Sequence, residues 1–154
     1  QLNLEVEMSE ITAEATVDIN APRSRVWQSL TDPASIKEYY LGADVQTDWQ
    51  IGSPIAFKGE WNGKPYEDKG EILAFEPERK LAYSHFSPMG GKPDAPENYH
   101  VVEVTLAERD GTTHVTLRQS NLEGGVSDED RSHRKDYETN WSQMLEGLKK
   151  TTER

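Results

Sequence analysis

The amino-acid sequence predicts an α+β fold in which one antiparallel sheet is covered by a long C-terminal helix. Between residues 54 and 120, runs of alternating apolar and polar side chains are separated by turn residues, a pattern typical of antiparallel strands. Near the C-terminus, apolar residues recur instead at helical spacing over about three turns. This last segment is the only one long enough to cover a sheet, so it is expected to close the core.

A first strand and two short helices are predicted at the start of the chain. Residues 11–19 alternate apolar and polar side chains, as a half-buried strand does. Pro22 has the fixed φ that suits the first position of a helix, and apolar residues at helical spacing follow it. A second start signal has Thr31 or Asp32 as the cap and Pro33 just inside the helix. The next glycine is expected to end this second helix.

The remaining strands are expected to form an antiparallel meander. Asn62-Gly63 is a strong signal for a two-residue hairpin turn. Residues 88–97 hold three prolines and two glycines, which predicts a long loop that is either a lid over a cavity or a surface excursion. The strands are expected at residues 54–61, 66–76, 80–87, 100–106 and 114–119.

The C-terminal helix has a start signal and one apolar stripe. Ser127 followed by Asp130 predicts a capping box at its N-terminus. Gly147 in the helix interior costs about 1 kcal/mol relative to alanine, so we expect a close packing contact there. The stripe consists of Tyr137, Trp141, Met144, Leu145 and Leu148.

Length and charge limit the function classes. The 154 residues fit one domain, expected at residues 11–154 after an N-terminal extension at residues 1–10. The 28 acids outnumber the 17 Lys and Arg residues, which gives a net charge of −11 and disfavours nucleic-acid binding. No uninterrupted apolar run is long enough for a membrane span. The absence of cysteine excludes disulfides and thiolate chemistry and fits a cytoplasmic protein.

An ordered set of short strings, mostly turn and core residues, covers residues 11–150. They lie at residues 19–22, 26–27, 30–33, 51–53, 62–64, 70–73, 77–81 and 111–117, and at Trp141, Leu145 and Leu148. In this order they resemble the helix-grip superfamily of the birch-pollen allergen and lipid-transfer domains, called SRPBCC or START-like. Within it, the chain is similar to the branch named after the activator of the heat-shock-protein-90 ATPase.

The resemblance implies a curved antiparallel sheet wrapped around the C-terminal helix, with a cavity between them. In this superfamily the cavity commonly holds a hydrophobic or aromatic small molecule, and some members are cyclases or hydrolases. The resemblance implies no shared catalytic motif and no cofactor, and it points to a cytoplasmic stress-response protein. Tyr39 and Tyr40 stand at the expected cavity mouth, where relatives often carry tryptophan. The eukaryotic co-chaperone has an additional N-terminal domain that these residues lack, which disfavours a chaperone partner.

The four histidines are the first candidates for acid–base or metal chemistry. No two are spaced i, i+2 or i, i+4, so the sequence predicts no metal site. His85 and His100 share strand parity with core residues and are expected to face the core. Each is either an ordinary hydrogen-bonded histidine or an acid or base in a cavity. His114 and His133 are expected on the surface.

Other catalytic signals are absent from the sequence. It contains no Gly-x-Ser-x-Gly elbow and no glycine-rich phosphate loop after a strand, so no catalytic residue is assigned. Glu71 and Glu103 lie within strands and could face inward. Because a buried unpaired carboxylate is costly, both are expected to be solvated on the outer face of the sheet.

Aromatic residues with polar tips are the most informative candidates. Four Trp and six Tyr residues outnumber three Phe residues, and such side chains can line a partly open pocket with a few directed hydrogen bonds. The alternative is that they are ordinary core residues, which we favour for Phe57 and Trp141. The candidate cavity residues are Trp27, Phe57, Trp61, Tyr83, His85, His100, Gln119, Trp141 and Leu145.

Three function classes therefore remain open. The first is the binding of a small hydrophobic or aromatic molecule in the cavity. The second is a cyclase or hydratase in which His85 or His100 is the general acid or base and Tyr83 or Tyr99 orients the substrate. The third is a chaperone-associated module that uses its acidic surface to meet a basic partner. A homodimer is compatible with the exposed strand edges.

Overall fold

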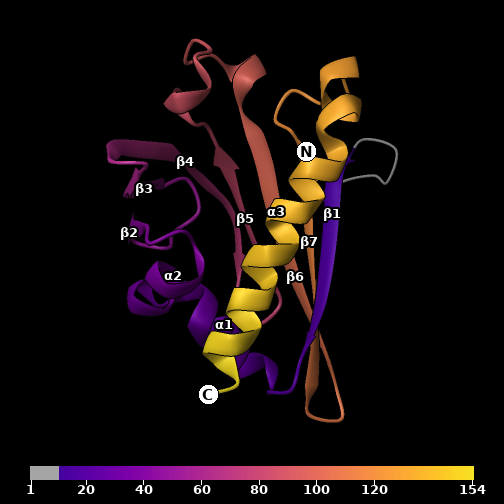
Figure 1. Cartoon of the computed structure of the whole chain (residues 1–154). Coiled ribbons are helices and arrows are strands. Elements are labelled where there is room, and N and C mark those ends of the chain that lie inside the picture. Colours follow the sequence, from indigo (N-terminus) through magenta and orange to yellow (C-terminus); the bar gives the residue numbers. More distant parts are fainter. Residues whose placement is uncertain (1–10) are drawn as a thin grey trace.

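The structure, a computed structural model, describes residues 11–154 except for the side chain of Trp61, so the predicted extension at residues 1–10 lies outside the described residues. Seven antiparallel strands form a sheet in the order β1-β7-β6-β5-β4-β3-β2, and α3 lies diagonally across one face (Figure 1). The elements are β1 (Ile11–Ile19), α1 (Arg23–Thr31), α2 (Pro33–Tyr39), β2 (Asp44–Gln46), β3 (Pro54–Trp61), β4 (Lys64–Glu76), β5 (Lys80–His85), β6 (His100–Arg109), β7 (Thr112–Asn121) and α3 (Asp128–Thr152), with 3₁₀ turns at Pro88–Gly90 and Pro96–Asn98. The predicted α+β helix-grip fold is confirmed.

Local signals explain most element boundaries. Asn62 and Gly63 both have positive φ (51° and 79°), as the predicted hairpin turn requires. The Asp32 carboxylate accepts a hydrogen bond from the Ser35 backbone N–H at 3.0 Å and caps α2. Pro22 lies at the N-cap of α1 in extended backbone and not inside the helix, so the predicted start of α1 was one residue too early. The short strand β2 was not among the predicted ranges.

The apolar stripe of α3 closes the core against the sheet. Leu145 and Leu148 are fully buried, and Trp141 and Met144 pack on the cluster from its margin. The N-terminus of α3 carries the predicted capping box, in which Ser127 and Asp130 exchange hydrogen bonds of 2.9 and 3.0 Å. The stripe and its cap therefore fix both the position and the beginning of the helix.

Side chains of α3 and of its C-cap residue also cover the free edge of β1. The carboxylates of Glu138 and Glu153 accept hydrogen bonds from the backbone N–H groups of residues 14 and 20, at 3.0 and 2.7 Å. Lys149 donates to the backbone carbonyl of residue 18 at 2.7 Å. Because β1 is an end strand, these contacts satisfy edge groups that another strand could otherwise pair with. A homodimer built through this part of the β1 edge is therefore disfavoured.

The opposite face of the sheet contains a buried charged pair. Glu103 alternates with the core residues Val102 and Val104 and so faces away from α3, yet it is only 3% exposed. The Lys80 ammonium lies 3.9 Å from its carboxylate and is itself largely buried. The expectation of a solvated Glu103 was wrong because an adjacent lysine offsets the cost of burying the carboxylate. Glu71 is exposed, as expected.

Gly147 makes the close contact that its position in the helix predicted. A Cβ atom at this residue would lie 3.1 Å from the Cβ of Tyr39, on α2. This separation is shorter than ordinary van der Waals contact between carbon atoms. The absence of a side chain at Gly147 therefore lets α2 pack directly on α3.

We expect Gly147→Val to lower the free energy of unfolding by about 1–3 kcal/mol, because a branched side chain overpacks the contact with Tyr39. Urea unfolding measures the loss. The control Gln143→Val places the same residue at an exposed position one turn earlier in α3. This control should lose only the difference in helix propensity between Gln and Val, about a few tenths of a kcal/mol. Equal losses in the two variants would contradict a close contact at Gly147.

Candidate ligand-binding site

A small cavity lies between α2, α3 and the sheet. Its volume is about 30 Å³, which is room for about one water molecule. The ligand-sized void that the sequence interpretation expected is therefore filled in this structure, mainly by large side chains. The lining residues are Leu30, Ile36, Tyr39, Tyr40, Trp49, Ile55, Phe57, Leu81, Tyr83, Val104 and Met144.

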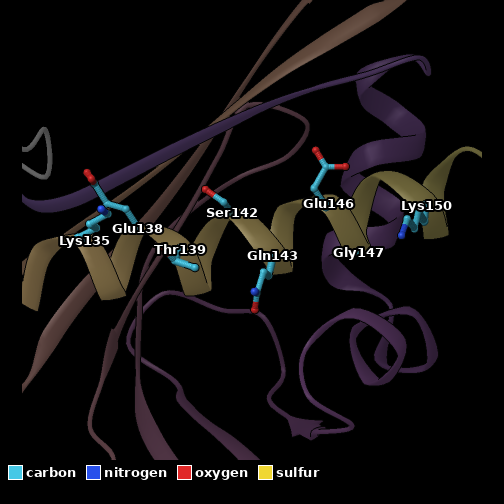
Figure 2. Close-up of a pocket in the computed structure, with 8 residues that line it drawn as sticks. All are labelled: Lys135, Glu138, Thr139, Ser142, Gln143, Glu146, Gly147 and Lys150. Carbon is cyan, nitrogen blue, oxygen red and sulfur yellow. The ribbon is translucent and has the colours of Figure 1, made fainter.

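A second depression lies on the exposed side of α3 and differs in character. Figure 2 shows the eight residues that line it, all of which come from this one helix. Most of them are polar or charged, and no second element supplies an opposing wall. Pockets that bind small molecules are typically concave and mostly apolar, so the cavity under α3 is the better candidate.

Aromatic rings and buried hydroxyls surround the cavity. The ring of Tyr40 stacks on Phe57 with a centroid distance of 4.9 Å, and Phe57 contacts Tyr83 at 5.5 Å. The hydroxyls of Tyr40 and Tyr83 share a hydrogen bond. Burial raises the pKa values of Tyr39, Tyr40 and Tyr83 far above the ordinary value for tyrosine. These hydroxyls therefore remain protonated and can donate hydrogen bonds at any physiological pH.

Next to this cluster, His85 pairs with a carboxylate. The Nε2 atom of His85 lies 3.1 Å from Oδ2 of Asp68, and the two side chains are 16% and 14% exposed. The His85 ring also contacts the edge of Phe57 at 6.0 Å. A carboxylate on one ring nitrogen fixes the orientation of a neutral imidazole and leaves the other nitrogen as a proton acceptor. His85 thus has the partner that an acid–base role requires.

Asp68 was missed by the sequence interpretation, although a signal for it existed. It pairs with Phe57 across the β3–β4 hairpin. A two-residue turn at Asn62-Gly63 fixes that register, because Trp61 must then face Lys64 and Phe57 must face Asp68. Since Phe57 was already a cavity candidate, counting along the hairpin would have placed the carboxylate on the same face.

A second polar group joins α3 to β6 and β7. The indole N–H of Trp141 donates to Oε1 of Gln119 at 2.7 Å, and Nε2 of Gln119 lies 3.5 Å from Nδ1 of His100. The His100 ring contacts the edge of Tyr137 at 6.2 Å. Burial lowers the pKa of His100, and nearby His85 lowers it further, whereas Asp130 opposes the change. This group holds the central part of α3 against the sheet.

The other candidates lie elsewhere. Trp27 packs against Phe75 at 5.2 Å, away from the histidines, and Leu145 is fully buried on α3. The side chain of Trp61 lies outside the described residues. Tyr99 stacks on Phe86 and donates a hydrogen bond to Asp94, so its ring and hydroxyl contact Phe86 and the loop and not a histidine.

The loop at residues 88–97 is tied to two elements. Asp94 forms an ion pair with Lys69 on β4. Lys92 lies 3.2 Å from the Glu129 carboxylate at the start of α3. The loop therefore bridges the sheet and the helix, and none of its residues lines the cavity.

The described residues, 11–154, lack two kinds of feature. These residues hold no group of three or more His, Asp or Glu side chains placed to share a metal ion. None of their helices combines the length and the apolar character needed to cross a membrane.

Residues 20–153 match the family model described as Activator of Hsp90 ATPase homolog 1-like protein. The chain belongs to this family. ChR145 from Cytophaga hutchinsonii, known from a solution structure, is 51% identical over 92% of this chain and 94% of its own, with a TM-score of 0.71. MLL2253 from Mesorhizobium loti is 25% identical over 90% and 95% of the two chains, with a TM-score of 0.67. The Aha1 dimer from Colwellia psychrerythraea is 20% identical over 92% and 95%, with a TM-score of 0.67, and shares the fold. No curated protein matches the chain.

The Trp141–Gln119 hydrogen bond can be tested by a double-mutant cycle. Gln119→Leu leaves the Trp141 N–H without its acceptor and should lower the free energy of unfolding by about 1–3 kcal/mol. In Gln119→Leu/Trp141→Phe both polar groups are gone, so the double variant should lose less than the sum of the two single variants. Urea unfolding of the four proteins measures the coupling. Strictly additive losses would show that the hydrogen bond contributes nothing to stability.

The lowered pKa of His100 predicts a pH dependence of stability. The unfolded chain, with a pKa near 6.5 at this residue, binds the proton more readily than the folded chain does. The contribution of neutral His100 is therefore fully present above that value and is lost as pH falls toward the lower folded value. We expect the free energy of unfolding to fall less steeply with acid in His100→Asn than in the wild type. His133→Asn, at an exposed position, is the control, and the same slope in all three proteins would refute a buried neutral His100.

Proposed function

We propose that this protein binds a small hydrophobic or aromatic molecule between the sheet and α3. The observation that carries the proposal is the ring cluster of Tyr40, Phe57 and Tyr83 around the cavity, with protonated hydroxyls inside it. Apolar surface supplies the affinity in such a site, and a few directed polar groups set the orientation of the ligand. The family membership fits a binding scaffold of this kind.

Binding requires the cavity to expand, because about 30 Å³ holds no organic molecule. Two elements of the lining can give way without opening the sheet: α2, which carries Tyr39 and Tyr40, and the segment after β2, which carries Trp49. Next to them, Leu41 and Ile51 are 70% and 68% exposed, so apolar surface is already present beside this wall. We propose that a ligand enters as α2 moves outward from α3.

The proposed contact residues extend from the cavity toward the polar end of the same face. Phe57 and Tyr83 line the cavity, and His85 follows Tyr83 on β5 with the same parity. The wider set consists of Trp27, Phe57, Trp61, Tyr83, His85, His100, Gln119, Trp141 and Leu145. A cytoplasmic location and a role in the stress response belong to the same proposal.

A second candidate function is a cyclase or hydratase on this scaffold. The His85–Asp68 pair favours it, since a histidine held by a carboxylate beside apolar rings can take up or release a proton. Tyr83 lies on the same strand and would orient the substrate in this proposal. A chaperone-associated module, the third class, has only the family name and the acidic charge in its favour. The covered edge of β1 leaves other surfaces for a homodimer.

Variants at Met144, which lines the cavity from α3, test the proposed function. With naphthol as a neutral aromatic probe, Met144→Ala should bind about tenfold more tightly because it enlarges the cavity by several methyl-sized groups. Met144→Trp fills the space and should weaken binding by a similar factor. Titrations followed by NMR chemical shifts measure both affinities.

The matched control is Gln143→Trp, which places the same large side chain on the exposed side of α3. This variant should bind naphthol as the wild type does if the probe occupies the cavity. Equal affinities in all four proteins, or no binding by any of them, would contradict ligand binding under α3.

A further inference from the structure

Only one of the two carboxylate oxygens of Asp68 makes a hydrogen bond. Oδ2 lies 3.1 Å from His85, whereas Oδ1 is buried and makes no hydrogen bond. The hydroxyl of Tyr66, two residues earlier on the same face of β4, is also buried without a hydrogen bond. A buried acceptor that lacks a donor carries a desolvation cost, and this cost is larger when the acceptor is charged. An incoming hydrogen-bond donor would remove this cost.

The Asp68 carboxylate gives this position a negative charge. Burial raises the pKa of Tyr66, and the carboxylates of Asp68 and Asp44 raise it further. The Asp68 carboxylate also raises the pKa values of Tyr40 and Tyr83, although burial is the larger cause there. A ligand that brings a positive charge to this end of the face would therefore be attracted, and an anion would be repelled.

The nearest lysines on these strands belong to the other face. Lys58 pairs with Glu67 across the β3–β4 hairpin, with 3.9 Å between ammonium and carboxylate. Lys69 pairs with Asp94 of the loop. Because successive side chains of a strand point to opposite faces, both lysines point away from the face that carries Phe57 and Asp68. Lys64 shares the parity of Asp68 but is exposed and lies four residues away, at the beginning of β4. Among the ion pairs of the described residues, Asp68 has His85 as its partner.

Several aromatic rings lie near Oδ1 of Asp68. Phe57 faces Asp68 directly across the hairpin, and its ring contacts those of Tyr40, Tyr83 and His85. Tyr66 lies over Gly59 of the neighbouring strand, so closely that a Cβ there would lie 2.6 Å from the hydroxyl. Ring faces attract ammonium groups, most strongly where water is excluded. One carboxylate and several rings together form a chemically suitable site for an organic cation.

We propose that the ligand carries a protonated amine on its apolar body, with the ammonium on Asp68 Oδ1 and the body among the Tyr40, Phe57 and Tyr83 rings. This inference rests on the proposed function and names the class of ligand. The amine supplies the donor that Oδ1 lacks and the positive charge that the Asp68 carboxylate attracts. A neutral alcohol of the same shape supplies only the hydrogen bond.

A pair of probes that differ only in this group tests the proposal. We expect naphthylethylamine to bind the wild type about tenfold more tightly than naphthylethanol at neutral pH and low salt. Asp68→Asn should abolish this preference. Glu67→Gln removes the same charge from the opposite face of β4, one residue away, and should retain it. Calorimetry or NMR titration measures all six affinities.

Three other outcomes would each contradict the inference, and they can be told apart. If both probes bind the wild type equally, the amine preference is wrong but the proposed function stands. If neither probe binds, the proposed function fails and this inference fails with it. An equal loss of preference in Glu67→Gln would mean that the overall negative charge, not Asp68, attracts the amine.

The salt dependence gives a second measurement in the wild type, which does not depend on Asp68→Asn folding. A preference that arises from a partly buried pair should persist when salt is raised to about 0.5 M, because screening acts mainly on exposed charges. A preference that disappears with added salt would overturn the assignment to Asp68.

Discussion

The packing of α3 against one face of the sheet is the constraint on which the rest of this structure depends. A seven-stranded sheet must cover its apolar face, and Leu145 and Leu148 of α3 are fully buried there. Glu138 and Lys149 of the same helix, together with its C-cap residue Glu153, accept from or donate to backbone groups along the free edge of β1 and just after it. Because one helix meets both requirements, α3 is held across the face of the sheet along its length (Figure 1).

The side chains beneath α3 change in character along the sheet. Near α1 and α2 they are mostly apolar, and α2 is held close by the absence of a side chain at Gly147. They become polar toward the C-terminal end of β5 and the N-terminal end of β6. His85, Asp68, His100 and Gln119 lie there on the same face. A molecule with an apolar body and one polar group would match this gradient. The distribution of these side chains, more than the size of the present cavity, supports a binding function.

The sequence was sufficient for the fold because its signals were local. The Asn62-Gly63 turn, the Ser127 cap and the stripe containing Leu145 and Leu148 each identify an element from a few residues, and their order identified the family. The candidate site was harder because its contacts join distant residues. His85 could be placed on the inner face by parity, but its pairing with Asp68 depends on the register of two strand pairs.

Local sequence patterns could not predict which charged side chains are buried. Glu103 was expected to be solvated, yet it is buried beside Lys80, a neighbour from another strand. Likewise, the filled cavity depends on how Tyr40, Phe57 and Tyr83 pack together, which strand periodicity does not determine. Periodicity assigns a residue to a face, whereas the volume left between faces depends on every side chain that enters it.

The central claim is that a ligand lies between the sheet and α3. Intermolecular nuclear Overhauser effects from a bound aromatic probe test it most directly, because they report which side chains lie next to the probe. We expect contacts with the rings of Phe57 and Tyr83 and with the Met144 methyl group. Contacts instead with Ser142, Gln143 and Glu146, in the depression on the outer side of α3 (Figure 2), would contradict the claim.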